Sequence, residues 1–375
     1  MPCGREGDFL YSIKIVGAVF DRPRANAVCP YLFPSEGGFY SPQKTLFIGE
    51  TACYNICIQK RQCCIDKERV KRMYEIDLGK SGLKVPTVAV GCMRISEMNE
   101  KQVSAFVDTA LGLGATFFDH ADIYGGGKSE EVFGKAVSPS MREKIFIQTK
   151  CGIRKGQYDF SYDHIVSSVD GSLKRLGTEY VDVLLLHRPD TLMEPDEVAR
   201  AFSYLKESGK VRHFGVSNHN PYQIKLLQNA LDMPLCANQV QFGVMHTPMV
   251  DAGINVNMHN DAGVNRDGGV LDFCRLENIT IQPWSPMQYG FFEGCFIDNE
   301  KFAALNDVLE RIGNQYGVSK TTVAIAWILR HPAKMQPVTG TTNLARLTDC
   351  LKAADVRITH EEWYEIYRAS GNKLP

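Results

Sequence analysis

The stretch TFFDHADIYGGGKSE (residues 116–130) holds a short apolar run that ends on an acidic side chain, Asp119, and Tyr124 follows five residues later. The next apolar run, KIFIQTK (144–150), ends on a basic side chain, Lys150. Apolar runs of this length that stop at a polar residue are typical of strands buried in a parallel sheet. Because the carboxyl ends of parallel strands meet at one edge, we expect Asp119, Tyr124 and Lys150 to lie close together.

From Met73 onward the same pattern repeats, with apolar runs alternating with amphipathic helical stretches. The apolar runs are 87–91, 116–120, 144–150, 181–187, 211–217, 236–242, 279–285 and 335–340. The helical stretches are 99–115, 129–137, 164–177, 195–210, 299–317, 319–332 and 359–370, and a polar insertion occupies 251–269. The early runs recur at about 30 residues, the size of one strand–helix unit. Residues 74–86 (YEIDLGKSGLKVP) predict a β-hairpin ahead of the first unit.

Both an open doubly wound sheet and a (β/α)8 barrel have this alternation. No GxGxxG follows the first strand, so the usual dinucleotide-binding fingerprint is missing. GGGK (125–128) also lacks the Walker pattern, and it predicts a turn into the helix 129–137 with Ser129 as N-cap. Polar residues end nearly every apolar run, which is where a barrel builds its site. We therefore expect a (β/α)8 TIM barrel preceded by a hairpin.

The polar residues at the strand ends suit carbonyl chemistry. After Asp119 and Lys150 come His187, Ser217 with Asn218, Gln239 and Trp284. A free tyrosine has a pKa of about 10 and donates protons poorly at neutral pH, but a nearby ammonium group lowers that pKa. A carboxylate keeps the lysine protonated, and a neutral histidine can orient a carbonyl oxygen. No side chain of this set is a hydride source, so reduction requires a bound cofactor.

These motifs resemble the aldo-keto reductase superfamily. FFDHADIYG (117–125) is similar to its Asp-Thr-Ala-x-x-Tyr-Gly signature, with His120 in place of the threonine. KIFIQTK, VDVLLLHRPD (181–190) and GVSN (215–218) resemble its lysine, histidine and Ser-Asn strands. The similarity covers residues 73–375, including the hairpin and the ending PVTGTTNLARLTDC (337–350), and looks closest to a bacterial branch of oxidoreductases.

The resemblance implies that the barrel binds NADPH in extended form, without a Rossmann domain, and reduces an aldehyde or ketone to an alcohol, with NADH as an alternative cofactor. It implies Tyr124 as general acid, Lys150 paired with Asp119 to lower the tyrosine pKa, and His187 as the group that orients the carbonyl. The implied cofactor contacts are Gly91, Met93, Ser217, Asn218, Gln239, Trp284, Ser285, Pro286, Met287, Gly340, Thr341 and Arg346. Ser217, Asn218 and Gln239 would meet the carboxamide, Trp284 the nicotinamide ring, and Arg346 the 2′-phosphate. Many members have a lysine where Gly340 stands.

Two other functions fit the same residues. One is an NADPH-binding, redox-sensing regulatory subunit with little turnover. The other is a Schiff-base aldolase with Lys150 as nucleophile, although Asp119 would keep that lysine charged. A metal-dependent hydrolase is a weaker alternative, because the first strand lacks paired histidine ligands. We expect no metal, and we expect the loops 243–270 and 287–299 to select the substrate.

The composition argues against a nucleic-acid-binding protein and against a membrane-spanning protein. The net charge of -1 gives no basic excess for binding nucleic acid, and no apolar run reaches the roughly 18 residues of a membrane span. Of 12 cysteines, six lie before residue 73. The cysteine content of 73–375 suits the reducing cytoplasm, and neither the individual carbonyl compound nor the oligomeric state follows from the sequence.

The first 72 residues have no counterpart in the resemblance and show no helical or strand period. We expect an unassigned, poorly ordered extension or the product of an upstream start site, and a single barrel domain over 73–375.

Overall fold

Eight strands lie where the sequence has its apolar runs. The computed structural model describes residues 75–375, and the extension expected over residues 1–72 lies outside this range, so the domain boundary at Met73 stays a prediction. The eight strands are β3 (Ala89–Gly91), β4 (Phe117–Asp119), β5 (Phe146–Cys151), β8 (Val181–Leu186), β9 (Val211–Ser217), β10 (Leu235–Gln241), β11 (Thr280–Trp284) and β14 (Val338–Thr339).

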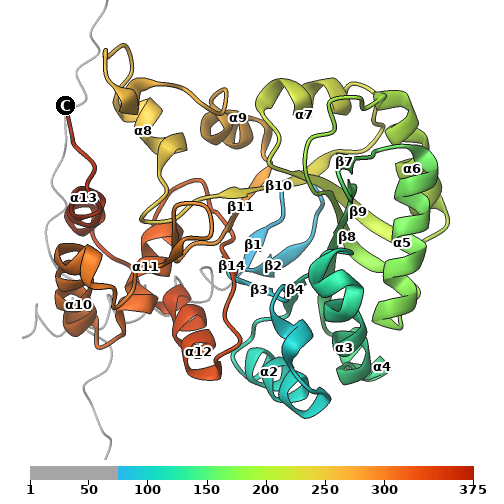
Figure 1. Cartoon of the computed structure of the whole chain (residues 1–375), viewed down its shortest axis with the longest axis horizontal. Coiled ribbons are helices and arrows are strands. Elements are labelled where there is room, and N and C mark those ends of the chain that lie inside the picture. The colour runs from blue at the N-terminus through green and yellow to red at the C-terminus, as the bar shows by residue number, and fades with distance from the viewer. Residues whose placement is uncertain (1–74) are drawn as a thin grey trace, which may run out of the picture. The chain divides into compact units, whose positions relative to one another are not determined.

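These strands form one parallel sheet in the order β11-β10-β9-β8-β5-β4-β3-β14. The backbone N–H of Gln336, two residues before β14, donates to the carbonyl of Ile281 in β11 at 3.0 Å. The first and last strands of the order are therefore neighbours, and the sheet closes on itself (Figure 1). The prediction of a (β/α)8 barrel is confirmed.

Alternation along the strands creates two apolar layers. In β8, Val183 and Leu185 belong to an inner cluster with Phe117, whereas Leu184 and Leu186 belong to the larger cluster shared with the helices. Successive side chains of a strand point to opposite faces, so one set fills the barrel and the other packs under the helices. This explains why all six residues of β8 are buried and why the run is apolar throughout.

The predicted hairpin is present as β1 (Glu75–Asp77) and β2 (Lys84–Pro86), paired antiparallel. The N–H of Gly79 in its turn donates to Thr280 Oγ1 at 2.8 Å, and that hydroxyl donates to the carbonyl of Asp77. Thr280 is the first residue of β11, so the hairpin covers the amino ends of the strands. The carboxyl ends remain available for a site.

Helices surround the barrel (Figure 1). They are α2 (Glu100–Gly112), α3 (Lys128–Ala136), α4 (Pro139–Arg142), α5 (Tyr162–Leu176), α6 (Pro195–Glu207), α7 (Pro221–Gln228), α8 (Pro248–Ile254), α9 (Val270–Glu277), α10 (Ala303–Tyr316), α11 (Lys320–Leu329), α12 (Leu344–Lys352) and α13 (His360–Ala369). The predicted amphipathic stretches correspond to α2, α3, α5, α6, α10, α11 and α13, whereas the other helices were not predicted. Short 3-10 turns are η1 (Ile95–Glu97), η2 (Tyr124–Gly127), η3 (Asp261–Gly263), η4 (Glu300–Phe302) and η5 (Ala353–Asp355). Two small hairpins, β6–β7 (Ile153–Arg154, Gln157–Tyr158) and β12–β13 (Gln288–Tyr289, Gly294–Cys295), lie between them.

One local expectation differs from the structure. Ser129 is not an N-cap: α3 begins one residue earlier, after Gly127, and the Ser129 hydroxyl donates to the carbonyl of Met93. A tertiary contact here outweighs the local capping preference. The polar insertion 251–269 contains the end of α8 and the turn η3.

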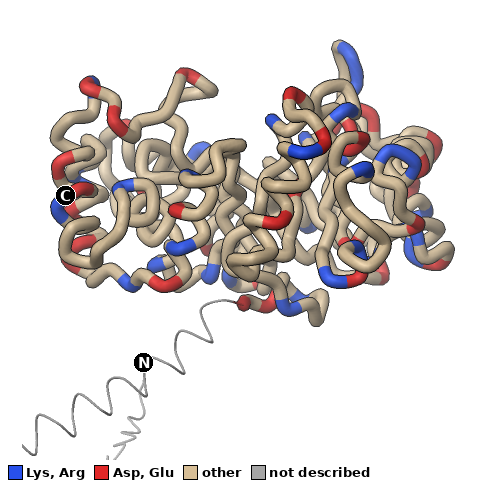
Figure 2. Tube along the Cα trace, turned by 90° about the horizontal axis from the view of Figure 1, so that it is seen from below, with Lys and Arg blue, Asp and Glu red and all other residues tan. Residues whose placement is uncertain are grey.

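Charged side chains of both signs are interspersed along the described trace (Figure 2). Within residues 75–375, no helix is both long enough and apolar enough to cross a bilayer.

Candidate active site

A left-handed turn places Tyr124 over the end of the barrel. Gly125, Gly126 and Gly127, which follow it in η2, have φ values of 58°, 66° and 93°. Residues with a side chain rarely adopt this backbone region, so three consecutive glycines make the turn accessible. A Cβ on Gly125 would also lie 2.5 Å from the side chain of Ser96. The glycines therefore reverse the chain after β4 and hold Tyr124 beside the tip of β5.

Lys150 is the centre of the site. Its Nζ donates to Asp119 Oδ2 at 2.8 Å, to the carbonyl of His120 at 2.7 Å and to the Tyr124 hydroxyl at 3.0 Å. The residue is 0% exposed. An ammonium group has three N–H donors, and all three are used here. The expected grouping of Asp119, Tyr124 and Lys150 is present, and the lysine is held at one place by its full set of hydrogen bonds.

A layer of buried glutamines supports Asp119 from below. Its Oδ1 accepts from Gln148 Nε2 at 2.6 Å and from Gln239 Nε2 at 3.0 Å. Both glutamines also donate to Gln282 Oε1, and Gln282 donates to Gln336. The carboxylate is therefore fixed through both oxygens. Sequence analysis predicted Gln239 as a cofactor contact and did not predict the roles of the other three glutamines.

Burial and the neighbouring groups have opposing effects on the pKa values of Tyr124 and Lys150. Burial raises the pKa of Tyr124 above its ordinary value of 10.0, and this effect exceeds the opposite influence of the Lys150 ammonium. Lys150 itself lowers the tyrosine pKa, as expected, but the net pKa stays above the ordinary value because burial has the larger effect. For Lys150, burial lowers the pKa, but Asp119 and Tyr124 together outweigh it and the net pKa is raised. The pair consists of a neutral phenol and an ammonium ion.

His187 lies at the tip of β8 beside Tyr124, with ring centroids 5.9 Å apart in an edge-to-face arrangement. Burial, the charge of Lys150 and the charge of Arg188 lower its pKa well below the usual value. The imidazole is therefore neutral at neutral pH, as the carbonyl-orienting role requires. Its Nδ1 has no hydrogen-bond partner among the described residues.

Two unusual side chains lie behind the lysine. Neither ring nitrogen of His120 has a hydrogen-bond partner in the described chain, and burial lowers its pKa to about 3. Its ring instead contacts Phe133, with centroids 4.5 Å apart. Asp122 Oδ1 also lacks a partner, and burial raises the pKa of that carboxyl to about 7. His120 therefore serves the site through its carbonyl rather than through its ring.

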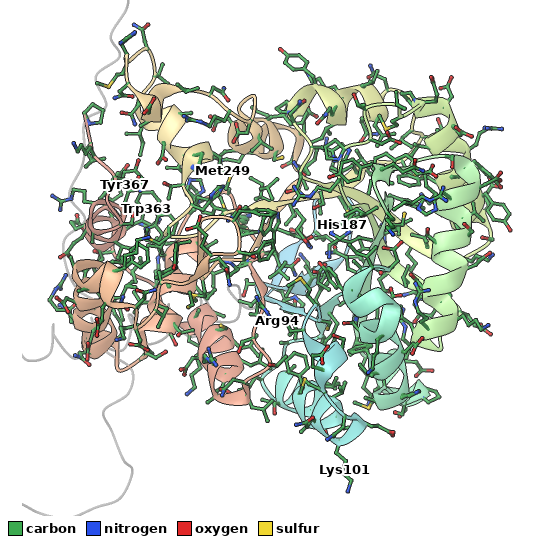
Figure 3. All side chains as sticks on the ribbon, viewed as in Figure 1. Arg94, Lys101, His187, Met249, Trp363 and Tyr367 are labelled. Carbon is green, nitrogen blue, oxygen red and sulfur yellow. The ribbon has the colours of Figure 1, made fainter. Side chains whose placement is uncertain are left out.

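A cavity of about 1040 Å³ opens at the carboxyl ends of the strands. His187 and Arg94 lie toward the middle of the barrel, whereas Trp363 and Tyr367 lie on α13 at its margin (Figure 3). Asp119, Tyr124 and His187 line the cavity, and Lys150 lies buried beneath it. All predicted cofactor contacts line it too: Gly91, Met93, Ser217, Asn218, Gln239, Trp284, Ser285, Pro286, Met287, Gly340, Thr341 and Arg346.

The structure shows why glycine is required at position 91 and which side chains hold Trp284 in place. A Cβ on Gly91 would lie 2.0 Å from the carbonyl oxygen of Thr339, so the close approach of β3 and β14 requires glycine there. Trp284 Nε1 donates to Asn218 Oδ1 at 3.0 Å. The Trp284 ring stacks on Phe292, which projects from the β12–β13 hairpin, with centroids 5.9 Å apart.

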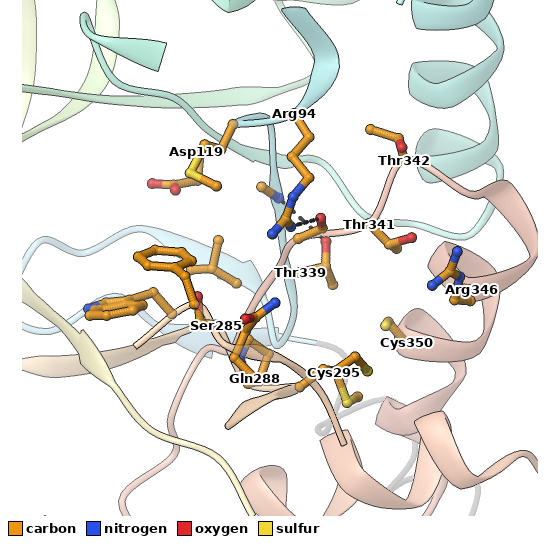
Figure 4. Close-up of a pocket in the computed structure, with 18 of the residues that line it drawn as sticks. Arg94, Asp119, Ser285, Gln288, Cys295, Thr339, Thr341, Thr342, Arg346 and Cys350 are labelled. Carbon is orange, nitrogen blue, oxygen red and sulfur yellow. Dashed lines mark hydrogen bonds between the residues drawn. The ribbon is translucent and has the colours of Figure 1, made fainter. Parts of the chain in front are cut away.

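The donor set fits a dinucleotide. Near the reactive group, Ser217, Asn218 and Gln239 offer hydroxyl and amide groups beside an indole ring. At the other end, Thr341, Thr342 and Arg346 surround the start of α12 (Figure 4). A helix amino terminus and an arginine together favour phosphate. One end of the cavity thus suits a carboxamide-bearing ring and the other suits phosphate groups.

Sequence analysis missed several lining residues, chief among them Arg94, Arg188 and Lys320. Arg94 donates to the carbonyl of Gly340 across the junction of β3 and β14 (Figure 4). Arg94 follows the predicted Met93 and Arg188 follows the predicted His187, so extending each strand end by one residue would have found both. Lys320 begins α11, and only the tertiary fold brings it to the cavity.

Over residues 75–375, no three His, Cys, Asp or Glu side chains are arranged to hold a metal ion.

Comparison with known proteins decides the family. The model of the Aldo/keto reductase family matches residues 87–370. The chain belongs to the aldo/keto reductase family. This confirms the resemblance stated from the motifs, and it makes the protein an oxidoreductase of a family that generally uses NAD(P)H.

Several aldo/keto reductase relatives are bacterial, in agreement with the expected branch. The 6-dehydroglucose reductase of Agrobacterium fabrum is 36% identical over 301 residues, which cover 76% of this chain and 94% of that protein. Oxidoreductase YdhF of Escherichia coli is 34% identical, covering 79% of this chain and 97% of YdhF. The crystal structure of the thermostable aldo-keto reductase Tm1743 with the inhibitor epalrestat has a TM-score of 0.64 and 25% identity, covering 79% of this chain and 99% of that one.

Proposed function

We propose that the protein reduces an aldehyde or ketone to an alcohol with NADPH as reductant and Tyr124 as general acid. The observation that carries this proposal is the set of three hydrogen bonds from buried Lys150 to Asp119, to the His120 carbonyl and to the Tyr124 hydroxyl. Lys150 holds the phenol at the edge of the cavity, and a phenol with a raised pKa keeps its proton at neutral pH. That proton is available to an oxygen on which negative charge develops.

The other residues that line the cavity would bind and orient the cofactor. When bound, a reduced nicotinamide cofactor supplies the hydride that no side chain of the cavity can provide. Ser217, Asn218 and Gln239 would hold its carboxamide, and Trp284 would pack against its ring. Gly91 and Met93 would lie along its ribose, Ser285, Pro286 and Met287 along its pyrophosphate, and Gly340, Thr341 and Arg346 at its 2′-phosphate. The arginine favours NADPH over NADH.

His187 and Tyr124 together would fix the substrate carbonyl. The neutral imidazole can donate one hydrogen bond to the carbonyl oxygen, and Tyr124 can donate the other. Two donors that converge on one oxygen stabilise the alkoxide that forms on it. The proton then passes from Tyr124 to that oxygen while the Lys150 ammonium stabilises the phenolate left behind.

The geometry of Lys150 counts against the Schiff-base alternative. A nucleophilic amine must lose its proton and face the substrate. Lys150 is fully buried, its pKa is raised, and its three N–H groups donate to protein atoms.

The regulatory alternative has one specific observation in its favour. An Arabidopsis thaliana relative, 29% identical over 309 residues, is called a probable voltage-gated potassium channel subunit beta. We favour the enzyme, because the donors that a reductase needs are all in place around one cavity. A cytoplasmic location belongs to the same proposal, and the six free cysteines of residues 75–375 support it.

Cofactor titration followed by turnover tests the proposal. We expect NADPH to quench tryptophan fluorescence at lower concentration than NADH, and NADPH to be consumed with aldehydes but not without them. Tight NADPH binding with no consumption on a broad panel of aldehydes and ketones would instead support the regulatory alternative.

A further inference from the structure

Arg188 is a cation of the cavity without an acidic partner. It lines the cavity directly after His187. None of the carboxylates in residues 75–375 forms an ion pair with it, and the contact that it makes is with an aromatic ring: its guanidinium carbon lies 5.7 Å from the centroid of Trp284. By contrast, Lys320 at the same cavity is paired with Asp298, and Arg154 nearby is paired with Asp159.

The place of Arg188 in the barrel separates it from the phosphate end. In the ring of eight strands, β8 lies four positions from β14 in both directions, so the two strands are opposite each other. Arg94 and Arg346 reach the cavity at the β3–β14 side, around Gly340. Arg188 follows β8 and therefore lies at the opposite side, next to the group that would hold the carbonyl.

The cavity that Arg188 lines also has apolar side chains. Ile123, Ile153, Trp284 and Phe292 are part of its lining, and Trp284 contacts the guanidinium. A guanidinium group without a carboxylate partner gains most from an anion that can accept two of its hydrogen bonds. The charge of Arg188 also contributes to the low pKa of His187.

We propose that Arg188 selects carbonyl substrates that carry an anionic group, a carboxylate or a phosphate, a few bonds from the carbonyl. This inference rests on the proposed reductase function and adds the substrate class. Because His187 and Arg188 are consecutive, one substrate can meet the imidazole with its carbonyl oxygen and the guanidinium with its anion. Ile123, Trp284 and Phe292 would contact the apolar atoms in between.

The test compares matched pairs of probes. One pair is 4-carboxybenzaldehyde and its neutral methyl ester, and the second is glyceraldehyde 3-phosphate and glyceraldehyde. We expect the wild type to prefer the anionic member of at least one pair, and the pair affected identifies the anion. In Arg188→Leu, kcat/KM for that anionic member should fall by about 10- to 100-fold while the neutral member changes little. Arg154→Leu removes a cation near the cavity that is already paired, and it should leave the preference intact.

A binding measurement separates this inference from the proposed function. Calorimetry with 4-carboxybenzyl alcohol and its methyl ester, added to the protein saturated with NADP⁺, does not require turnover. Tighter binding of the carboxylate in the wild type, lost in Arg188→Leu and kept in Arg154→Leu, supports the inference even if no carbonyl is reduced. Reduction of neutral aldehydes with no anion preference in binding or turnover, or equal losses in both variants, overturns it and leaves the reductase function standing.

Discussion

Tyr124 and His187 have pKa values displaced in opposite directions, and the displacements predict the pH dependence of catalysis. The acid must be protonated, and the raised pKa of Tyr124 keeps it so until the pH exceeds 10.0. The orienting imidazole must be neutral, and its lowered pKa keeps it so well below pH 6.5. We therefore expect kcat/KM for reduction to be flat between about pH 6.5 and 9.5 and to fall only above that range. Initial rates across this range check it, and a sigmoid fall centred near pH 6.5 would contradict the assignment of His187.

Replacing the buried side chain of His120 should stabilise the folded protein. Its ring is buried with both nitrogens unpartnered, which costs free energy, so His120→Leu should raise the free energy of unfolding by about 1–3 kcal/mol at pH 8. The folded pKa of about 3 lies below the unfolded value of 6.5, so only the unfolded chain gains a proton as the pH falls from 6.5 toward 3. The stability from this group is lost over that range, and the gain from leucine should be roughly 2 kcal/mol larger at pH 5.

Urea denaturation at pH 8 and pH 5 measures both parts of this effect. His360→Leu, at an exposed position on α13, is the control and should change little at either pH. A loss of stability in His120→Leu at both pH values would mean that the ring has a polar partner.

Among the elements, the strands bring the glutamine layer together. Gln148 on β5 joins Asp119 on β4 to Gln282 on β11, and it is fully buried. Gln148→Leu removes one of the two hydrogen bonds that Asp119 Oδ1 and Gln282 Oε1 each accept, which should cost about 1–3 kcal/mol of unfolding free energy. It should also lower kcat, because Asp119 and through it Lys150 lose a fixed position. Urea denaturation and steady-state rates measure both effects, and Gln157→Leu on exposed β7 is the control. Unchanged stability and kcat would contradict the supporting role of the layer.

At the scale of the whole molecule, the part of this chain that matches its bacterial relatives corresponds to almost their whole length. Matches that cover 76–79% of this chain cover 94–97% of the two bacterial relatives described above. We therefore expect a chain that starts at Met73 to have the same melting temperature and the same kcat/KM as the full chain. Differential scanning calorimetry and steady-state rates check this. A clear drop in either for the shorter chain would show that residues 1–72 contribute to the domain.

The sequence predicted the barrel and the positions of several site residues, but it did not predict the hydrogen bonds and pKa shifts of the site. Asp119, Lys150 and His187 could be placed because a buried parallel strand shows its end as the point where apolar residues stop. The hydrogen-bond partners of Gln148 could not be predicted from the sequence. One of them is 134 residues away, and a glutamine inside an apolar run does not indicate its partner. The direction of the Tyr124 pKa shift also required the fold, because it depends on how deeply packing buries the phenol and not on the presence of Lys150 alone.

The measurement that tests the account most directly is the turnover of Tyr124→Phe. The substitution removes the hydroxyl 3.0 Å from Lys150 Nζ and keeps the ring. We expect kcat for carbonyl reduction to fall by about 100- to 10,000-fold, while the dissociation constant for NADPH, measured by fluorescence titration, changes little. Tyr158→Phe, on exposed β7, should leave both unchanged. Wild-type turnover in Tyr124→Phe with intact NADPH binding would contradict the role of Tyr124 as the general acid.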